Sequence, residues 1–291
     1  MKIIHDLFWK FLNSTYKYWP DELWLKVLYR SKLHRKLDLD NPRRFTDKLN
    51  WLKLHDRNPL YTKLVDKYEV KQYIKDKLGE QMVIPLYGVW NHFDEIDFDK
   101  LPHQFVLKCT HDSGRLCICK DKASFDKVKA KEKLEKSLKN NFFWWTREWA
   151  YKDVKPRIIA EKYMEDGSND ALTDYKFFCF NGEPKMMYIS HDVSSDPRTD
   201  FFDMEWNHLP FRVKDPHADV LPEKPAKFDE MRNIARILSA GIPHVRVDLY
   251  VINNQIYFGE MTFYHNSGIF SVTPDDWDYK IGDWLTLPQI S

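Results

Sequence analysis

Five short strand-like runs follow Pro156, and they constrain the fold more than any other feature of the chain. Each is rich in β-branched and aromatic residues, as strands are. Asn181-Gly182 and Asn253-Asn254 lie between two pairs of runs and accept the positive φ angles of hairpin turns. This pattern predicts a mostly antiparallel sheet with few helices, which is an α+β domain. The runs cover residues 157–161, 175–180, 185–190, 244–252 and 255–260, with one helical pattern at 228–240.

Helical periodicity dominates the chain before residue 98. Apolar residues recur at three- and four-residue steps in residues 1–36, 45–55 and 61–78, and the last pattern stops at Gly79. We therefore expect a mostly helical N-terminal region. Residues 82–90 form a strand-like run after the helical patterns. Residues 105–110 and 116–119 then predict a hairpin with its tip at Gly114, followed by a helix over 125–140 with Ser124 as N-cap.

Charge and composition exclude several classes of protein. The 291 residues include 45 Lys and Arg against 44 Asp and Glu, so we expect no non-specific binding of nucleic acid, which needs surplus cations. No apolar run reaches 18 residues and no signal-peptide pattern opens the sequence, so we expect neither a membrane span nor export. Four cysteines are too few for a disulfide scaffold in a chain this long, which favours a cytoplasmic location.

The first 36 residues form a basic amphipathic pattern, with eight basic and three acidic side chains. Such a helix either docks its apolar stripe on its own domain, the common case, or lies on an anionic membrane surface. The second alternative would place the protein at the inner face of the membrane.

The run of residues 244–252 carries the sharpest chemical signal. Strand alternation puts Arg246 and Asp248 on one face, and Glu260 and Thr262 share a face of the next run. If the two strands pair through their turn, both carboxylates and the guanidinium converge. Converging carboxylates suit Mg2+, a hard cation that takes oxygen ligands. The alternative is an ordinary cross-strand salt bridge.

Two further segments carry weaker signals. Lys108 lies on the predicted strand 105–110, just before the small-residue turn at Ser113 and Gly114. A strand lysine beside such a turn can contact a phosphate while backbone N–H groups cover its other oxygens. Asp174 and Lys176 alternate onto one strand face, suiting a ribose or metal contact and a phosphate contact; the alternative is an edge strand with solvated charges. Before them an apolar strand ends in a segment suited to a flat heterocycle, made of Glu161, Lys162, Tyr163 and Met164. Neither a P-loop nor a dinucleotide-binding motif is present.

Taken in order, these motifs resemble the ATP-grasp superfamily, and within it the teichuronopeptide-biosynthesis (TupA-like) branch. The likeness spans roughly residues 40 to 290. The first hundred residues look more helical than the Rossmann-like domain that usually precedes the family's fold. The narrower likeness rests on Asn41-Pro42, 45–52, 65–68, 84–89, Arg147-Glu148-Trp149 and 258–262.

The resemblance implies that a nucleotide is sandwiched between two α+β lobes, residues 99–164 and 165–291, after a helical N-terminal region over 1–98. It implies phosphate contacts for Lys108 and Lys176, a flap at Ser113-Gly114, an adenine hinge over Glu161, Lys162, Tyr163 and Met164, and a ribose or metal contact for Asp174. It also implies Mg2+ ligands at Asp248 and Glu260, with Arg246 stabilising anionic intermediates. Thr262 stands where the family usually has asparagine, so either Thr262 or Asn266 completes the metal shell.

The function that this resemblance implies is ATP- and Mg2+-dependent ligation of a carboxylate to an amine through an acyl phosphate. The branch suggests a uronic acid and an amino acid or other amine in capsular or surface-polysaccharide assembly, with a lipid-linked or nucleotide-linked glycan as one possible partner. Two alternatives stay open at this point: a glycosyltransferase that uses a nucleotide sugar, and a non-catalytic binding protein.

Other patterns carry less weight. Cys109, His111, Cys117 and Cys119 have residue types that bind zinc, but free cysteines are more often small buried apolar residues. The pairs Asp38-x-Asp40 and Asp276-x-Asp278 are similar to the metal-binding pair of glycosyltransferases, but neither follows a clear buried strand, so we expect loop acids. No H-E-x-x-H and no G-x-S-x-G occur.

Overall fold

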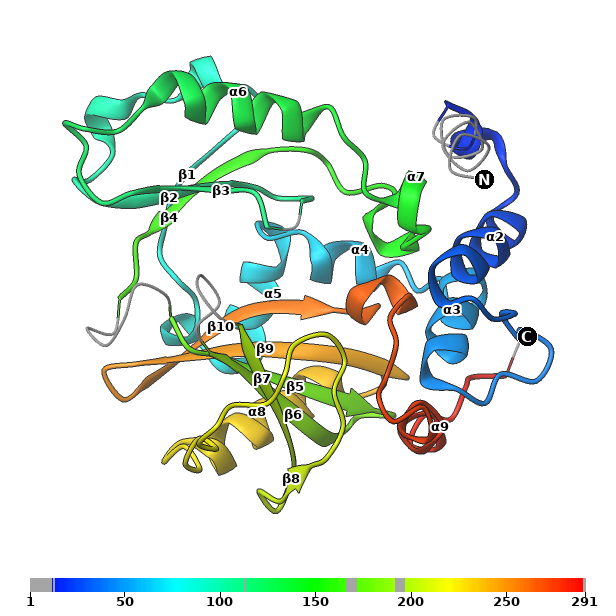
Figure 1. The fold of residues 1–291 in the computed structure, drawn as a ribbon. Coiled ribbons are helices and arrows are strands. Elements are labelled where there is room, and N and C mark those ends of the chain that lie inside the picture. The colour runs from blue at the N-terminus through cyan, green and yellow to red at the C-terminus, as the bar shows by residue number, and fades with distance from the viewer. Residues whose placement is uncertain (1–11, 13, 113, 166–171, 192–196, 290–291) are drawn as a thin grey trace.

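The computed structural model describes residues 12, 14–112, 114–165, 172–191 and 197–289. Two antiparallel sheets lie one above the other, with helices on their outer sides and at one end (Figure 1). The predicted α+β class is confirmed. The helices are α2 (Asp21–Leu33), α3 (Phe45–His55), α4 (Leu60–Val65), α5 (Glu69–Leu78), α6 (Lys127–Leu138), α7 (Phe143–Thr146), α8 (Phe228–Ser239) and α9 (Asp276–Asp283).

Two helices, α5 and α6, begin at other residues than the sequence predicts. The predicted helix over 61–78 is broken into α4 and α5, because the Asp66 carboxylate accepts hydrogen bonds from the backbone N–H groups of Tyr68 and Glu69 and so begins a new helix. Helix α6 is capped by Asp126, whose side chain accepts from the Lys129 N–H, and not by Ser124. The predicted stop at Gly79 is confirmed by its φ of +94°.

The small sheet has four strands in the order β1-β4-β2-β3. Its strands are β1 (Leu86–Trp90), β2 (Phe105–Cys109), β3 (Leu116–Cys119) and β4 (Ile158–Lys162). Phe105 and Leu107 are buried against α6, while Lys108 is on the opposite face of β2. Strand β1 lies within the strand-like run expected at residues 82–90 and pairs with β4, so the small sheet includes chain before residue 98.

The large sheet has the order β10-β9-β5-β6-β7-β8. Its turns at Asn181-Gly182 and Asn253-Asn254 have positive φ angles, as predicted. Helix α8 covers the outer face, and α5 lies between the two sheets (Figure 1). The strands are β5 (Asp174–Phe180), β6 (Glu183–His191), β7 (Arg198–Asp203), β8 (His208–Leu209), β9 (His244–Ile252) and β10 (Gln255–Thr262).

The core is divided between the two sheets. One cluster joins the large sheet to α3, α4, α5 and α8, and a second joins the small sheet to α6. Most of the predicted N-terminal stripe lies outside the described residues, although Leu12 is buried against Trp24 and Leu28. Within the part of the chain that the structure describes, no helix is long and apolar enough to span a bilayer.

Candidate active site

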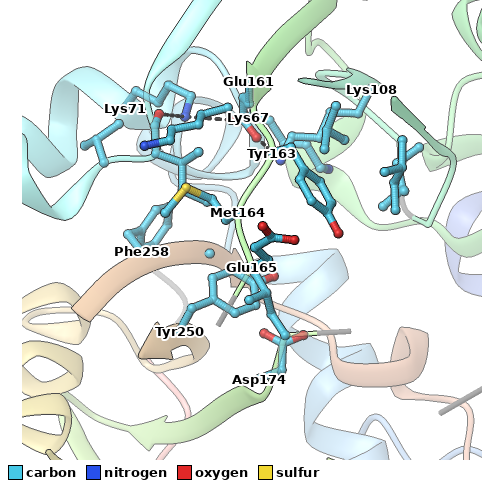
Figure 2. A pocket seen from close by; sticks show the side chains of 18 of the residues that line it. Lys67, Lys71, Lys108, Glu161, Tyr163, Met164, Glu165, Asp174, Tyr250 and Phe258 are labelled. Atoms are coloured by element: carbon cyan, nitrogen blue, oxygen red, sulfur yellow. Dashed lines mark hydrogen bonds and ion pairs between the residues drawn. The ribbon is translucent and has the colours of Figure 1, made fainter. Parts of the chain in front are cut away.

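A cavity of about 260 Å³ lies between the two sheets (Figure 2). Strands β2 and β4, helix α5 and the segment after β4 form one wall, and the β9–β10 hairpin forms the opposite wall. Charged side chains stand on the first wall, with Asp174 and Tyr250 on the other (Figure 2). Apolar side chains also line the cavity: Val70, Val83, Ile84, Val106, Leu116, Ile118, Met164, Leu172 and Phe258.

Glu161 lies between two lysines on the cavity wall. Its carboxylate is 2.5 Å from the Lys108 ammonium and 2.6 Å from that of Lys71. Burial alone would raise the pKa of Glu161, but the two ammonium groups hold that pKa below its usual value. Burial lowers the pKa of Lys71, although Glu161 opposes the shift. The Glu161 side chain thus positions two cations rather than only marking the start of a hinge.

Lys71 and Lys67 were not predicted as site residues, although both line the cavity. Lys71 lies on α5 beside Val70 and one turn before Ile74, both of which are buried, whereas Lys67 lies in the turn before this helix. The signal that points to Lys71 is therefore a lysine next to the buried side of a helix. The Lys67 ammonium donates to the backbone carbonyl of Asp112 beside the β2–β3 turn.

The turn and the segment after β4 reach the cavity from the small sheet. Tyr163 and Met164 line it, and Lys162 is exposed with its backbone N–H donating to Pro85 O. Gly114 has a φ of +73° and an open position at the hairpin tip, while Ser113 lies outside the described residues.

Arg246, Asp248 and Glu260 come together on the inner face of the large sheet. Glu260 is opposite Asp248 in the β9–β10 pair, and Thr262 is opposite Arg246. The guanidinium makes two hydrogen bonds to Asp248, at 2.7 and 2.6 Å, and a third to Glu260 at 3.1 Å. The predicted convergence of two carboxylates and an arginine is confirmed as geometry.

Lys176 completes this cluster from β5. Its ammonium is 2.7 Å from Asp248 and 2.8 Å from Asp174. Burial alone would raise the pKa of Asp248, but Arg246 and Lys176 pull it below its usual value. For Asp174 burial prevails and the pKa is raised. Asp248 is therefore an anion fully covered by two cations.

A model of the TupA-like ATP-grasp family matches residues 47–286, which is most of the chain. The chain belongs to the TupA-like ATP-grasp family. The resemblance drawn from the order of the motifs is thus confirmed. None of the curated proteins matches the chain.

Several solved structures match the chain at low identity. D-alanine–D-alanine ligase from Bacillus anthracis, complexed with ATP, is 17% identical with a TM-score of 0.40, covering 69% of this chain and 55% of that one. The enzyme of the same name from Helicobacter pylori is 15% identical with a TM-score of 0.40, covering 77% and 61%. N5-carboxyaminoimidazole synthase from Aspergillus clavatus, in complex with ADP and 5-aminoimidazole ribonucleotide, is 14% identical with a TM-score of 0.39, covering 70% and 46%. The TupA-like chain spans about half the length of these proteins.

The donor set around the inner cluster fits a magnesium ion. Asp248 and Glu260 offer carboxylate oxygens from paired strands, and the Thr262 hydroxyl lies 3.2 Å from Glu260. Both Asp248 oxygens accept from cations here, so a metal would replace part of those contacts. Asn266 is exposed on the 3₁₀ turn His265–Gly268 and borders the same region.

The structure also locates three sets of residues that the sequence analysis considered as metal ligands but gave little weight. In the described part of the chain, Cys109, Cys117, Cys119 and His111 do not form a metal-ligand group, and His111 bonds to the carbonyls of Ser137 and Asn140. The group that does occur there is Asp200, His208 and His217, in which both imidazoles lie 3.1 Å from one buried carboxylate oxygen.

The expectation that Asp276 and Asp278 are loop acids is wrong, because both lie in α9. Asp278 is fully buried and accepts from the backbone N–H and the hydroxyl of Thr46 and from Arg35, which joins α9 to the start of α3. Asp38 does lie in a loop, where its carboxylate accepts from the N–H of Asn41.

Proposed function

We propose that this protein is an ATP- and Mg2+-dependent ligase that joins a carboxylate to an amine through an acyl phosphate. A carboxylate oxygen attacks the γ-phosphorus of ATP and ADP leaves. The amine nitrogen then attacks the acyl carbon, the bond to phosphate breaks, and the nitrogen loses one proton. Phosphorylation is needed because an unactivated carboxylate has no good leaving group.

The observation that carries the proposal is the continuity between the cavity and the inner cluster along β9. Tyr250 lines the cavity, Asp248 is two residues away, and Arg246 two more. Residues two apart in a strand are separated by about 7 Å and point to the same face, so these three side chains mark a lane of roughly 14 Å. A nucleotide in the cavity would extend its phosphates along this lane toward Arg246.

The cavity offers apolar contacts at one end and positive charge at the other, as the base and the phosphates of ATP require. Val106, Met164 and Phe258 offer apolar contacts to a flat base. Lys71 and Lys108, with Lys176 beyond them, offer positive charge to phosphate oxygens. In our proposal, Asp248 and Glu260 hold Mg2+ with Thr262 or Asn266, and the metal neutralises charge on the transferring phosphoryl group. Asp174 contacts the ribose or the metal, and Ser113-Gly114 covers the phosphates.

For the substrates, we propose a uronic acid as the carboxylate and an amino acid or another small amine as its partner, in surface-polysaccharide assembly inside the cell. The support is the membership of the TupA-like family. Contact of the N-terminal segment with the membrane stays part of this proposal.

Thermal unfolding with nucleotides tests the first step. We expect ATP with Mg2+ to raise the unfolding midpoint by several degrees, since a ligand at 100 times its Kd stabilises the native state by about 2.7 kcal/mol. Lys108→Gln should lose most of this shift. Lys185→Gln, a control at an exposed strand lysine, should keep it. A shift with UDP-glucuronic acid or UDP-glucose but none with ATP would instead indicate a glycosyltransferase, and no shift with any of them would indicate a non-catalytic protein.

Product analysis tests the second step. ADP release should require glucuronic or galacturonic acid, and mass spectrometry should detect an amide when an amino acid mixture is added. Steady ATP hydrolysis that no carboxylate stimulates would contradict the ligase assignment.

A further inference from the structure

A second cavity, of about 240 Å³, opens where the lane along β9 ends. Arg246 and Glu260 stand on its border, so it begins at the position where the proposed acyl phosphate would form. Its other walls come from segments far apart in the sequence: the residues on either side of α7, and β10 with the 3₁₀ turn after it. The remaining lining residues are Phe142, Glu148, Tyr151, Thr262, Tyr264, Asn266 and Ser267.

Glu148 is a buried carboxylate on the wall of this second cavity, with 3% of its surface exposed. One of its oxygens accepts a hydrogen bond from the Ser267 hydroxyl at 2.5 Å. A carboxylate has about four lone-pair sites, so capacity to accept further hydrogen bonds remains. An isolated buried charge costs several kcal/mol, which makes an acid at this position expensive unless it has a use or a close counter-charge.

The counter-charge to Glu148 is Lys53 of α3, but its hydrogen bonds go elsewhere. The Lys53 ammonium donates to the carbonyls of Thr146 at 2.8 Å and Ser267 at 2.7 Å and to the Asn50 amide oxygen at 3.2 Å. An ammonium has three N–H donors, so this set uses all of them. Lys53 therefore offsets the charge of Glu148 without occupying its oxygens.

Tyr264 supplies an independent observation. Its side chain is 3% exposed, it lines the second cavity, and its hydroxyl has no hydrogen-bond partner among the described residues. A buried hydroxyl without a partner is unfavourable, so a group that enters the cavity and bonds to it stabilises the complex. The unpaired hydroxyl and the carboxylate that can still accept point to a ligand with a polar, hydrogen-bearing atom.

The surroundings favour an amine as that ligand. The Glu148 carboxylate attracts a cation, and Phe142, Tyr151 and Tyr264 contribute aromatic rings to the lining. The charged groups that face Glu148 are Lys53 from α3, Arg246 from β9 and Glu260 from β10. Burial raises the pKa of Glu148 above its usual value, with Lys53 opposing the shift.

We propose that this second cavity binds the amine substrate of the ligase, with Glu148 and Tyr264 hydrogen-bonded to its nitrogen and Glu148 accepting the proton that it loses. This inference rests on the proposed function. The nitrogen forms a bond to the acyl carbon, the carbon–oxygen bond to phosphate breaks, phosphate leaves toward Arg246, and the proton moves to a Glu148 oxygen. The cavity volume suits a small primary amine such as an amino acid.

The test separates the amine step from the phosphoryl step by using hydroxylamine. Hydroxylamine is a small neutral nucleophile that traps acyl phosphates as hydroxamates. It therefore reports acyl phosphate formation even when the Glu148 side chain cannot bind or deprotonate an amine. Glucuronic acid and galacturonic acid serve as carboxylates and the mixture of amino acids as amines. Glu148→Gln should lower the rate of amide formation at least 100-fold while hydroxamate formation and the KM for ATP stay within about threefold.

Tyr264→Phe guards against a folding defect, since it removes a hydroxyl that bonds to no described residue. We expect its unfolding midpoint to equal or exceed that of the wild type, and its KM for the amine to rise about fivefold or more. Glu132→Gln, at an exposed acid of α6, is the matched control and should change neither rate. Equal loss of amide and hydroxamate in a folded Glu148→Gln, or unchanged amine kinetics in both variants, would overturn the assignment of the second cavity. Absence of hydroxamate in the wild type would instead overturn the ligase function itself.

Discussion

At the scale of single residues, Arg246 and Glu260 belong to one cluster but differ in what their removal does. Arg246 is 7% exposed and pairs with Asp248, which is fully buried. Removing one partner of such a pair costs about 3–5 kcal/mol because the other charge stays buried. Arg246→Ala would therefore confuse a loss of catalysis with a loss of folding, whereas the Glu260 side chain is 38% exposed and tolerates an isosteric change.

We predict that Glu260→Gln lowers ATP-dependent amide formation at least 100-fold, because it removes one proposed metal ligand and weakens charge stabilisation of the phosphoryl group. The unfolding midpoint should stay within about 2 °C of the wild type. Coupled-enzyme detection of ADP and differential scanning calorimetry measure the two quantities. A folded variant with normal turnover would remove Glu260 from the metal site.

His244 controls a different property, the pH dependence of stability. It is buried at the start of β9, where its Nδ1 donates to Cys179 O at 2.9 Å and its Nε2 has no partner among the described residues. Burial lowers its pKa to about 3, against a usual value of about 6.5. Because the folded-state pKa is depressed, the unfolded chain binds the proton first, and stability is lost as the pH falls below about 6.5 toward 3.

We predict that His244→Asn makes the free energy of unfolding less dependent on pH between 6.5 and 4. One such histidine contributes a slope of up to about 1.4 kcal/mol per pH unit, so the difference in slope between variant and wild type isolates it. Urea titrations at pH 7, 6 and 5 measure the slope. His103→Asn, at an exposed site, is the control. Identical slopes in the wild type and His244→Asn would contradict the prediction.

At the scale of elements, the β9–β10 hairpin positions both ends of the lane through an irregularity in its pairing. The register shifts between Phe258 and Glu260, which places Gly259 against the backbone of Asp248. A Cβ at position 259 would lie 2.9 Å from the Tyr250 ring and 3.0 Å from Asp248 O. Glycine is therefore required at this position by close approach, and the approach keeps the Tyr250 ring in its place on the cavity wall.

We predict that Gly259→Ala raises the KM for ATP about tenfold, because the new methyl group displaces the Tyr250 ring or widens the hairpin at the cavity. The cost in stability should be about 1–3 kcal/mol, the usual range for overpacking. Initial rates at varied ATP and a urea unfolding curve give both values. Gly241→Ala is the control: its Cβ meets no atom within 4 Å, although its φ of +77° strains any side chain, so stability should fall without a change in KM.

At the scale of the whole molecule, the two sheets have separate cores and meet at the charged wall of the first cavity. Lys71 stands on α5, which packs in the core of the large sheet, and its ion pair with Glu161 reaches β4 of the small sheet. The side chains are 12% and 6% exposed, so water screens the pair weakly. The pair therefore connects the lobes as well as presenting a cation to the cavity.

We predict that Lys71→Gln reduces the thermal shift caused by ATP to less than half and destabilises the apoprotein by about 2 kcal/mol, since Glu161 keeps only Lys108. Lys75→Gln, one turn further along α5, breaks an ion pair with the exposed Glu80 and should leave the stability and the ATP shift almost unchanged, because water screens this pair. If the two variants show the same ATP-induced thermal shift and the same stability, Lys71 has no specific role in binding ATP or in joining the two sheets.

The sequence by itself determined those features that depend on neighbours along the chain. The period of two placed Arg246 and Asp248 on one face of β9 and Glu260 and Thr262 on one face of β10. Their pairing across the hairpin depends on the shift in register at Gly259, because regular pairing from the turn would set Glu260 opposite Val247. Asn181-Gly182 and Asn253-Asn254 marked the turns for the same local reason. The order of such motifs was specific enough to indicate the family.

Only the tertiary structure decided which distant segments meet. Lys71 contacts a carboxylate 90 positions later, Glu148 bonds to Ser267 across an even longer stretch, and β1 pairs with the distant β4. No periodicity records these contacts, because they are chosen by how the apolar faces of whole elements pack and by the cost of leaving a buried charge without a partner. The second cavity depends on that choice, since its walls come from elements that only packing brings together.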